Sequence, residues 1–202
     1  MAGTILVSTA YLPSVEYFSI LAESDETLIE KEENYIKQTY RNRCYILSAS
    51  GPEILTVPVL EGSLHKTALK DIRIDYSKRW PQVHLGAINA AYRSSPYFDF
   101  YFDDIERVIL STPKFLLDLN FELLSFLISA LKIRTEIKYT THFEPVENHE
   151  SDYRYLITPK KEKLLNLPRY RQTFPFESEF APGFSAIDLL FNMGPDSCLY
   201  LK

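Results

Sequence analysis

The chain contains few glycines, and the glycine-rich loops that bind nucleotide phosphates are absent from it. Only six glycines occur among its 202 residues. No GxGxxG follows the first hydrophobic segment and no GxxxxGK[ST] occurs, so the sequence encodes neither a Rossmann dinucleotide loop nor a P-loop. We therefore predict no cofactor.

Cysteine and histidine are also scarce. The two cysteines, Cys44 and Cys198, are too few for a disulfide framework, and the four histidines are scattered along the chain. No zinc-ligand spacing results, so we predict no metal site. Cys44 beside a base would be a candidate nucleophile, but a free cysteine is more often a small core residue, and we favour that interpretation.

An excess of basic residues and long apolar runs are missing as well. The net charge is -5 and the pI is about 5.5, which argues against nucleic-acid binding, and no uncharged apolar run reaches the roughly 18 residues that span a bilayer. The first residues carry no cationic leader. We expect a cytoplasmic protein with a single domain over residues 1–202.

The pattern of apolar residues predicts an α/β or mixed α+β fold. A strand at 5–8, a helix at 15–21 and a strand at 26–30 have the order of a parallel unit. Strands at 41–47 and 54–59 flank the turn sequence SASGP and predict a hairpin. The other predicted elements are a strand at 72–76, helices ending near 92 and covering 100–110 and 115–133, a strand at 135–143, and a helix at 185–193. We expect a central, mostly parallel sheet with a hairpin extension and flanking helices.

The stretch NYIKQTYRNRCYI, residues 34–46, carries more directional hydrogen-bond donors than a half-buried strand needs. On a strand, Arg41 and Arg43 share one face and Asn42 points the other way, which predicts a two-pronged clamp for a carboxylate or phosphate. Tyr35 offers a ring or a hydroxyl beside them. The alternative is a solvated charge face in which the arginines pair with neighbouring glutamates.

Two further stretches carry candidate site residues. Trp80 and His84 lie one turn apart on one apolar helix face, and His84 is a candidate general base, with a satisfied core histidine as the alternative. Asp188 in FSAIDLLFNMGP is a candidate carboxylate. Its spacing from Ser185 is that of a capping box, and this local explanation is the favoured one.

Several of these strings, in this order, resemble the WbqC-like protein family. They are AYLPSVEYF, ENYIKQTYRNRCYI with LTVPV, WPQVH, AYRSSPYF and SAIDLLFNMGP, and the resemblance covers residues 10–201. Where many relatives have a Gln- or His-Pro-x-Tyr-Leu-Pro string, this chain has Ser8, Thr9 and Ala10 before Tyr11, Leu12 and Pro13. The motif strings also contain Tyr11 and Tyr17, which we add to Tyr35, Arg41, Asn42, Arg43 and Trp80 as predicted substrate-binding residues.

The resemblance implies a bacterial protein, because family members often occur in gene clusters for lipopolysaccharide O-antigen or other surface glycans. It suggests a transferase or ligase acting on an activated or aminated sugar, with His84 as base and Arg41 as anchor. The alternative is a non-catalytic binding module for an anionic small molecule, and a structural partner protein is a weaker third. We also predict that Tyr11, Arg41, Asn42 and His84 line one pocket.

Overall fold

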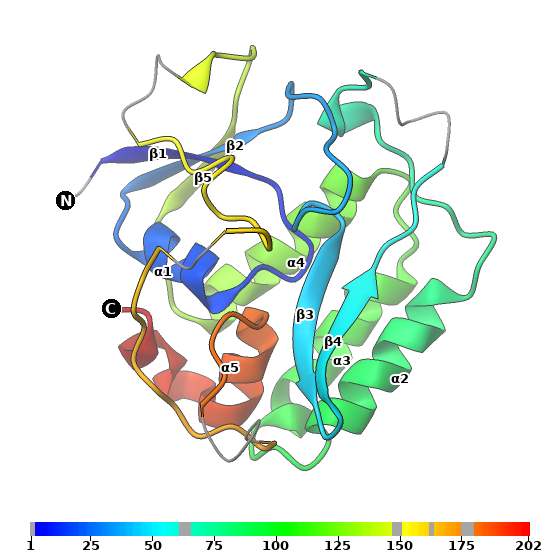
Figure 1. Ribbon diagram of the computed structural model, residues 1–202, viewed down its shortest axis with the longest axis vertical. Helices are drawn as coiled ribbons and strands as arrows, with labels where there is room; N and C mark the ends of the chain where they lie inside the picture. The colour runs from blue at the N-terminus through cyan, green and yellow to red at the C-terminus, as the bar shows by residue number, and fades with distance from the viewer. Residues whose placement is uncertain (1–2, 61–65, 147–150, 162–163, 175–179) are drawn as a thin grey trace.

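The computed structural model describes residues 3–60, 66–146, 151–161, 164–174 and 180–202 (Figure 1). Three parallel strands, an antiparallel hairpin and five α-helices make up the fold, so the predicted α/β class is confirmed. The strands are β1 (Thr4–Ser8), β2 (Glu26–Glu30), β3 (Arg43–Ser48), β4 (Gly51–Thr56) and β5 (Glu136–Tyr139); the helices are α1 (Val15–Ala22), α2 (Trp80–Tyr92), α3 (Phe98–Leu110), α4 (Leu116–Ala130) and α5 (Ala186–Met193).

The parallel sheet has the strand order β1-β2-β5. The predicted strand–helix–strand unit is confirmed, because α1 connects β1 to β2 and the two strands pair in parallel from Thr4 opposite Glu26 to Ser8 opposite Glu30. Ser14 caps α1 by accepting a hydrogen bond from the Tyr17 amide, which fixes where the chain turns after β1. The three carboxyl ends therefore meet at one edge of the sheet.

A segment from late in the sequence runs along the free side of β1. The Leu6 amide donates to the Ser151 carbonyl at 3.0 Å, and the Tyr153 amide donates to the Leu6 carbonyl at 2.8 Å. Leu6 and Asp152 form a parallel bridge. We call residues 151–154 the edge segment; no strand was predicted there.

The hairpin differs from its predicted position by a few residues. Strand β3 begins at Arg43, so Arg41 and Asn42 lie in the turn before it, and β4 begins at Gly51. Ala49 and Ser50 form a two-residue turn between the strands, and Gly51 has a φ of 107°, which a glycine adopts without strain. The predicted shared strand face of Arg41 and Arg43 is therefore wrong.

The strand predicted at 72–76 is also wrong. Only single bridges form there, between Val59 and Ile74 and between Arg73 and Phe115. Ile72 and Ile74 are buried and alternate with more exposed residues, which is the pattern of a strand. In the part of the chain that the structure describes, no neighbouring strand runs alongside for long enough to build a ladder.

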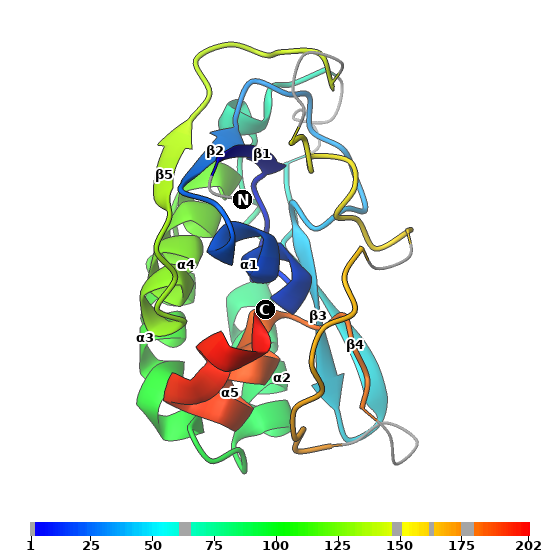
Figure 2. The ribbon, with the colours of Figure 1, turned by 90° about the vertical axis from the view of Figure 1, so that its left-hand side faces the viewer.

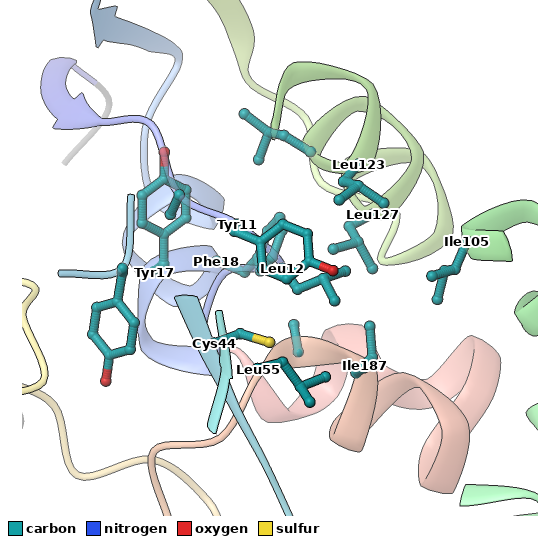
Figure 3. Packing of buried hydrophobic residues seen from close by; sticks show 14 of the residues in the cluster. Tyr11, Leu12, Tyr17, Phe18, Cys44, Leu55, Ile105, Leu123, Leu127 and Ile187 are labelled. Atoms are coloured by element: carbon teal, nitrogen blue, oxygen red, sulfur yellow. The ribbon is translucent and has the colours of Figure 1, made fainter. Parts of the chain in front are cut away.

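The hydrophobic core lies where the sheet, the hairpin and the helices meet. Helix α4 buries seven residues, including Leu123, Leu124 and Leu127, which confirms that the long apolar helix is an interior one. Figure 2 shows the hairpin on the side opposite α3 and α4, with α1 and α5 between them. Figure 3 shows Cys44 among these buried side chains, as the core interpretation expected. No helix in the described part of the chain is long and apolar enough to cross a membrane.

Candidate functional site

The carboxyl edge of the parallel sheet carries a group of buried charges. Strand β1 ends at Ser8, β2 ends at Glu30 and β5 ends just before Thr140. Ligands of open α/β sheets bind outside the carboxyl ends of the strands, so this edge is the expected position of a binding site. Glu30 is completely buried, and its carboxylate accepts hydrogen bonds from the Glu32 amide and the Thr140 hydroxyl, both at 2.8 Å.

Arg41 is held at this edge by a bidentate ion pair. Its Nε and Nη2 donate to the two carboxylate oxygens of Glu33 at 2.9 and 2.6 Å. Nη2 also donates to the Ser8 hydroxyl at 2.6 Å, and Nη1 donates to the Thr39 hydroxyl at 3.2 Å. The alternative interpretation, in which the arginines pair with neighbouring glutamates, is confirmed for Arg41, but the pair is not solvated, because the Arg41 and Glu33 side chains are only 5% and 0% exposed.

Arg154 of the edge segment forms the second ion pair. Its Nη2 donates to Asp152 at 2.6 Å and to the Glu144 carbonyl at 2.8 Å, and its Nε also donates to Asp152. Its Nη1 donates to Glu30 at 3.0 Å. The Tyr155 ring centre lies 5.8 Å from the Arg41 guanidinium and 5.7 Å from that of Arg154. We call Glu30, Glu33, Arg41, Asp152 and Arg154 the ion-pair cluster.

Both arginines line one small cavity. Its volume is about 10 Å³, the space of a single water molecule. Among the described residues no carboxylate lines it, so the cavity contacts the two arginines and not their acidic partners. The lining residues are Ser8, Thr9, Ala10, Ser14, Tyr17, Tyr40, Arg41, Tyr153, Arg154 and Ile157.

A larger pocket of about 260 Å³ is lined by Glu30, the ion-pair partner of Arg154. Its polar lining includes Glu30, Glu144 and His142, and the His142 Nε2 lies 3.0 Å from a Glu144 oxygen. We call it the acidic pocket; its lining residues are Leu6, Leu28, Glu30, Tyr139, Thr140, Thr141, His142 and Glu144. Among the described residues, no group of three or more His, Cys, Asp or Glu side chains is arranged to hold a metal ion.

His84 lies in the core together with Tyr11 and Trp80. The Tyr11 hydroxyl is 2.9 Å from the His84 Nδ1, and the His84 ring also hydrogen-bonds to the backbone of Thr56. Burial lowers the pKa of His84 from 6.5 to about 4, so the ring is neutral near pH 7. Trp80 packs edge-on at 5.0 Å from the His84 ring. This is the position of a satisfied core histidine.

Three predicted binding residues of the 34–46 stretch, Tyr35, Asn42 and Arg43, are absent from the lining of both spaces. Asn42 is buried, and its side-chain amide donates to the Val57 carbonyl at 2.9 Å. Burial raises the pKa of Tyr35 to about 12, although the charges of Arg43 and Arg41 oppose this shift. Arg43 is half-buried at the start of β3. Their predicted part in substrate binding stays a prediction.

Tyr17 does reach the predicted site. It lines the cavity, and its hydroxyl donates to the Ser8 carbonyl at 3.0 Å. Arg41 is beside it, whereas Tyr11, Asn42 and His84 do not line this cavity. The prediction that Tyr11, Arg41, Asn42 and His84 share one pocket is therefore wrong for the Arg41 cavity.

Asp188 has a structural explanation. Ser185 caps α5, and the buried Asp188 carboxylate accepts hydrogen bonds from the Tyr170 hydroxyl and, at 2.9 Å, from the Gln172 amide. Burial raises the pKa of Asp188, and these donors oppose the shift. Asp188 thus fixes the chain around Tyr170 to α5.

The sequence analysis missed Asp152, Arg154 and His142. A signal was present in SDYRY, residues 151–155, where charged residues alternate with tyrosines as they do in the 34–46 stretch. The alternation lies outside any predicted element, so nothing placed it beside β1. His142 has no such signal, because scattered histidines do not indicate a metal site.

Arg41→Lys tests whether the bidentate pair with Glu33 stabilises the fold. Lysine keeps the charge but has no planar fork, so one charged hydrogen bond is lost and the free energy of unfolding is expected to fall by about 1.5 kcal/mol. Arg43→Lys, as the matched control, is expected to change it by less than about 0.5 kcal/mol. Urea unfolding of both variants measures the difference, and equal effects would contradict a structural role specific to Arg41.

The fold and the site together define an α/β protein with a buried ion-pair cluster at the carboxyl edge of a short parallel sheet. The model of the WbqC-like protein family matches residues 9–167, and the chain belongs to this family. It is similar to "Uncharacterized protein Rv1507c" of Mycobacterium tuberculosis (strain ATCC 25618 / H37Rv), with 25% identity over 229 aligned residues that cover 100% of this chain and 98% of the relative. No solved structure matches.

Proposed function

We propose that the protein is a group-transfer enzyme acting on an activated or aminated sugar in the biosynthesis of a surface polysaccharide of the O-antigen type. The observation that carries the proposal is the presence of two spaces at the carboxyl edge, the arginine-lined cavity beside Arg154 and the acidic pocket beside its ion-pair partner Glu30. Family membership supports it. The proposal places the reaction in the cytoplasm, in keeping with the unpaired Cys44 and Cys198.

The acidic pocket suits the amino group of an aminated sugar. Glu30 and Glu144 line it, and no lysine or arginine of the described residues does, so a protonated amine meets carboxylates there. Tyr139, Leu6 and Leu28 supply apolar surface for the face of a sugar ring. A monosaccharide with one amino group combines these two requirements.

His142 is the base that this geometry favours. It lines the acidic pocket, is 71% exposed at the side chain, and is oriented by Glu144 on one ring nitrogen and by the Thr141 hydroxyl, at 3.0 Å, on the other. A histidine held by a carboxylate can take a proton from an attacking amine or hydroxyl. In the proposal His142 takes the role predicted for His84, because the His142 ring is exposed at the pocket whereas the His84 ring is buried in the core.

The test is a panel of nucleotide-activated and amino sugars screened by thermal shift, followed by turnover assays with any sugar that raises the melting temperature. Glu144→Gln is expected to lose most of the turnover, because the His142 ring loses its orienting charge, and to reduce the melting-temperature shift of an aminated sugar, because the pocket loses one of its two carboxylates. Glu136→Gln, an exposed glutamate of β5 outside the pocket lining, is the matched control and should behave as wild type.

The second candidate, a binding module for an anionic small molecule, gives a different result. A stabilising anion with no turnover, unaffected by Glu144→Gln, would favour it. A panel in which no sugar changes the melting temperature would contradict the proposed function.

A further inference from the structure

Each guanidinium of the ion-pair cluster has one N–H donor left after its contacts within the described residues. Arginine carries five N–H donors. Arg41 uses four of them in the contacts given above, and Arg154 also uses four. Within the described residues, one Nη1–H of each arginine has no partner, although both side chains are at least nine-tenths buried. Both arginines line the same cavity.

The size of the cavity limits what these donors can bind. A volume of about 10 Å³ holds one water molecule, and so it also holds a single oxygen atom of a larger ligand. Thr9 also lines the cavity, whereas the Ser8 hydroxyl already donates to the Arg154 carbonyl at 3.2 Å and accepts from Arg41 at 2.6 Å. The two remaining N–H donors require an oxygen acceptor.

The charge of the cluster decides between a charged and a neutral oxygen. Glu30, Glu33 and Asp152 carry three negative charges against the two positive charges of Arg41 and Arg154, so the formal net charge is -1. A phosphate or carboxylate would add negative charge to a buried cluster that already has an excess of it, and burial makes that excess costly. A neutral hydroxyl or carbonyl oxygen accepts the same N–H bonds without this cost.

We propose that the cavity between Arg41 and Arg154 is a subsite for one neutral oxygen of the substrate, a hydroxyl or a carbonyl, and that it excludes anions. The inference rests on the proposed function for the view that the substrate is a sugar. It replaces the predicted clamp for a carboxylate or phosphate, and it assigns Arg154 to substrate binding. The phosphate of an activated sugar would then lie outside this cavity.

A variant that neutralises one carboxylate of the cluster tests whether the net charge of the cluster excludes anions from the cavity. Glu33→Gln keeps an oxygen that accepts from Arg41 but brings the formal charge of the cluster to zero. Inorganic phosphate, titrated against chloride at constant ionic strength, is expected to raise the melting temperature of Glu33→Gln by about 2 °C or more and to leave wild type unchanged. Glu32→Gln, the neighbouring and more exposed partner of Lys70, is the control and should not respond. Asp152→Asn makes the same change of charge and replaces Glu33→Gln if that variant does not fold.

A neutral probe tests the other half of the proposal. N-acetylglucosamine offers both hydroxyls and an amide carbonyl, and its contact with the protein is measured by saturation-transfer NMR. Wild type is expected to give a signal that Ile157→Trp removes by filling the cavity, whereas Val83→Trp, at an exposed position of α2, keeps it. Competition by phosphate in wild type, or no signal from the neutral sugar, would overturn the proposal.

The two arms separate this proposal from the proposed function. Phosphate binding to wild type overturns the neutral subsite and leaves sugar transfer standing. If neither phosphate nor the neutral sugar affects any variant, the cavity holds only a structural water and the subsite is refuted, whatever the sugar panel gives.

Discussion

Arg154→Met is expected to lower the free energy of unfolding by about 3 to 5 kcal/mol. The Arg154 side chain is fully buried, and its removal leaves Glu30 and Asp152 without their counter-charge at side-chain exposures of 0% and 3%. Methionine fills much of the volume of the arginine side chain, so the decrease in the free energy of unfolding reports the lost charge and not only lost packing. Urea unfolding monitored by far-UV circular dichroism gives the value.

The control for this substitution is Arg107→Met. Arg107 forms an ion pair with Asp104 on α3, but the two side chains are 74% and 46% exposed, and a change of at most about 1 kcal/mol is expected. Adding Glu30→Gln to Arg154→Met should recover part of the loss, because it removes one of the two uncompensated carboxylates. Similar losses for Arg154→Met and Arg107→Met would show that the ion-pair cluster does not hold the carboxyl edge together.

Acid is expected to destabilise the protein through His84. Its folded pKa of about 4 lies below the ordinary value of 6.5, so the neutral ring contributes stability that is fully present above pH 6.5. This contribution is lost as the pH falls from 6.5 through 4, and the difference between the two pKa values corresponds to about 3 kcal/mol. Protonation would place a charge beside the buried Tyr11 hydroxyl.

Urea unfolding of wild type and His84→Gln between pH 8 and pH 4 isolates this effect. Glutamine does not titrate, so the variant is expected to be less stable at pH 8 but to lose less stability on acidification. Asp188 changes stability in the opposite direction, since its raised pKa adds stability as the pH falls, but it does so equally in both proteins. His142→Gln, at an exposed position, should keep the wild-type slope. Parallel curves for wild type and His84→Gln would contradict the low pKa.

Local patterns predicted those parts of the fold whose partners are close in sequence. The parallel unit of β1, α1 and β2 follows from two short apolar runs around a capped helix, and the hairpin follows from the turn at Gly51. The error at 72–76 has the same origin, because alternation indicates a half-buried segment whether or not a partner strand exists. Ile72 and Ile74 are buried against loops and helix ends.

The candidate site was only partly predictable because its charges come from distant segments. The surplus of hydrogen-bond donors around Arg41 indicates a site. Arg154, the other arginine of the ion-pair cluster, lies 113 positions later in the sequence. Its segment hydrogen-bonds to β1 but shows no periodic pattern of apolar residues that would predict this. For His84 the local sequence pattern is clear, but it fits two interpretations. One histidine on an apolar helix face suits a base or a core residue equally well, and only the Tyr11 hydroxyl, 73 positions away, distinguishes them.

The edge segment also has a consequence for the behaviour of the protein in solution. Without residues 151–153, the outer side of β1 would present unpaired amides and carbonyls flanked by Ile5 and Val7, a template for pairing with another chain. Arg154 holds this segment in place through Glu30, so the ion pair that shapes the cavity also shields the sheet from self-association. Substitutions that free the segment should therefore produce aggregation at protein concentrations where the wild type stays dispersed.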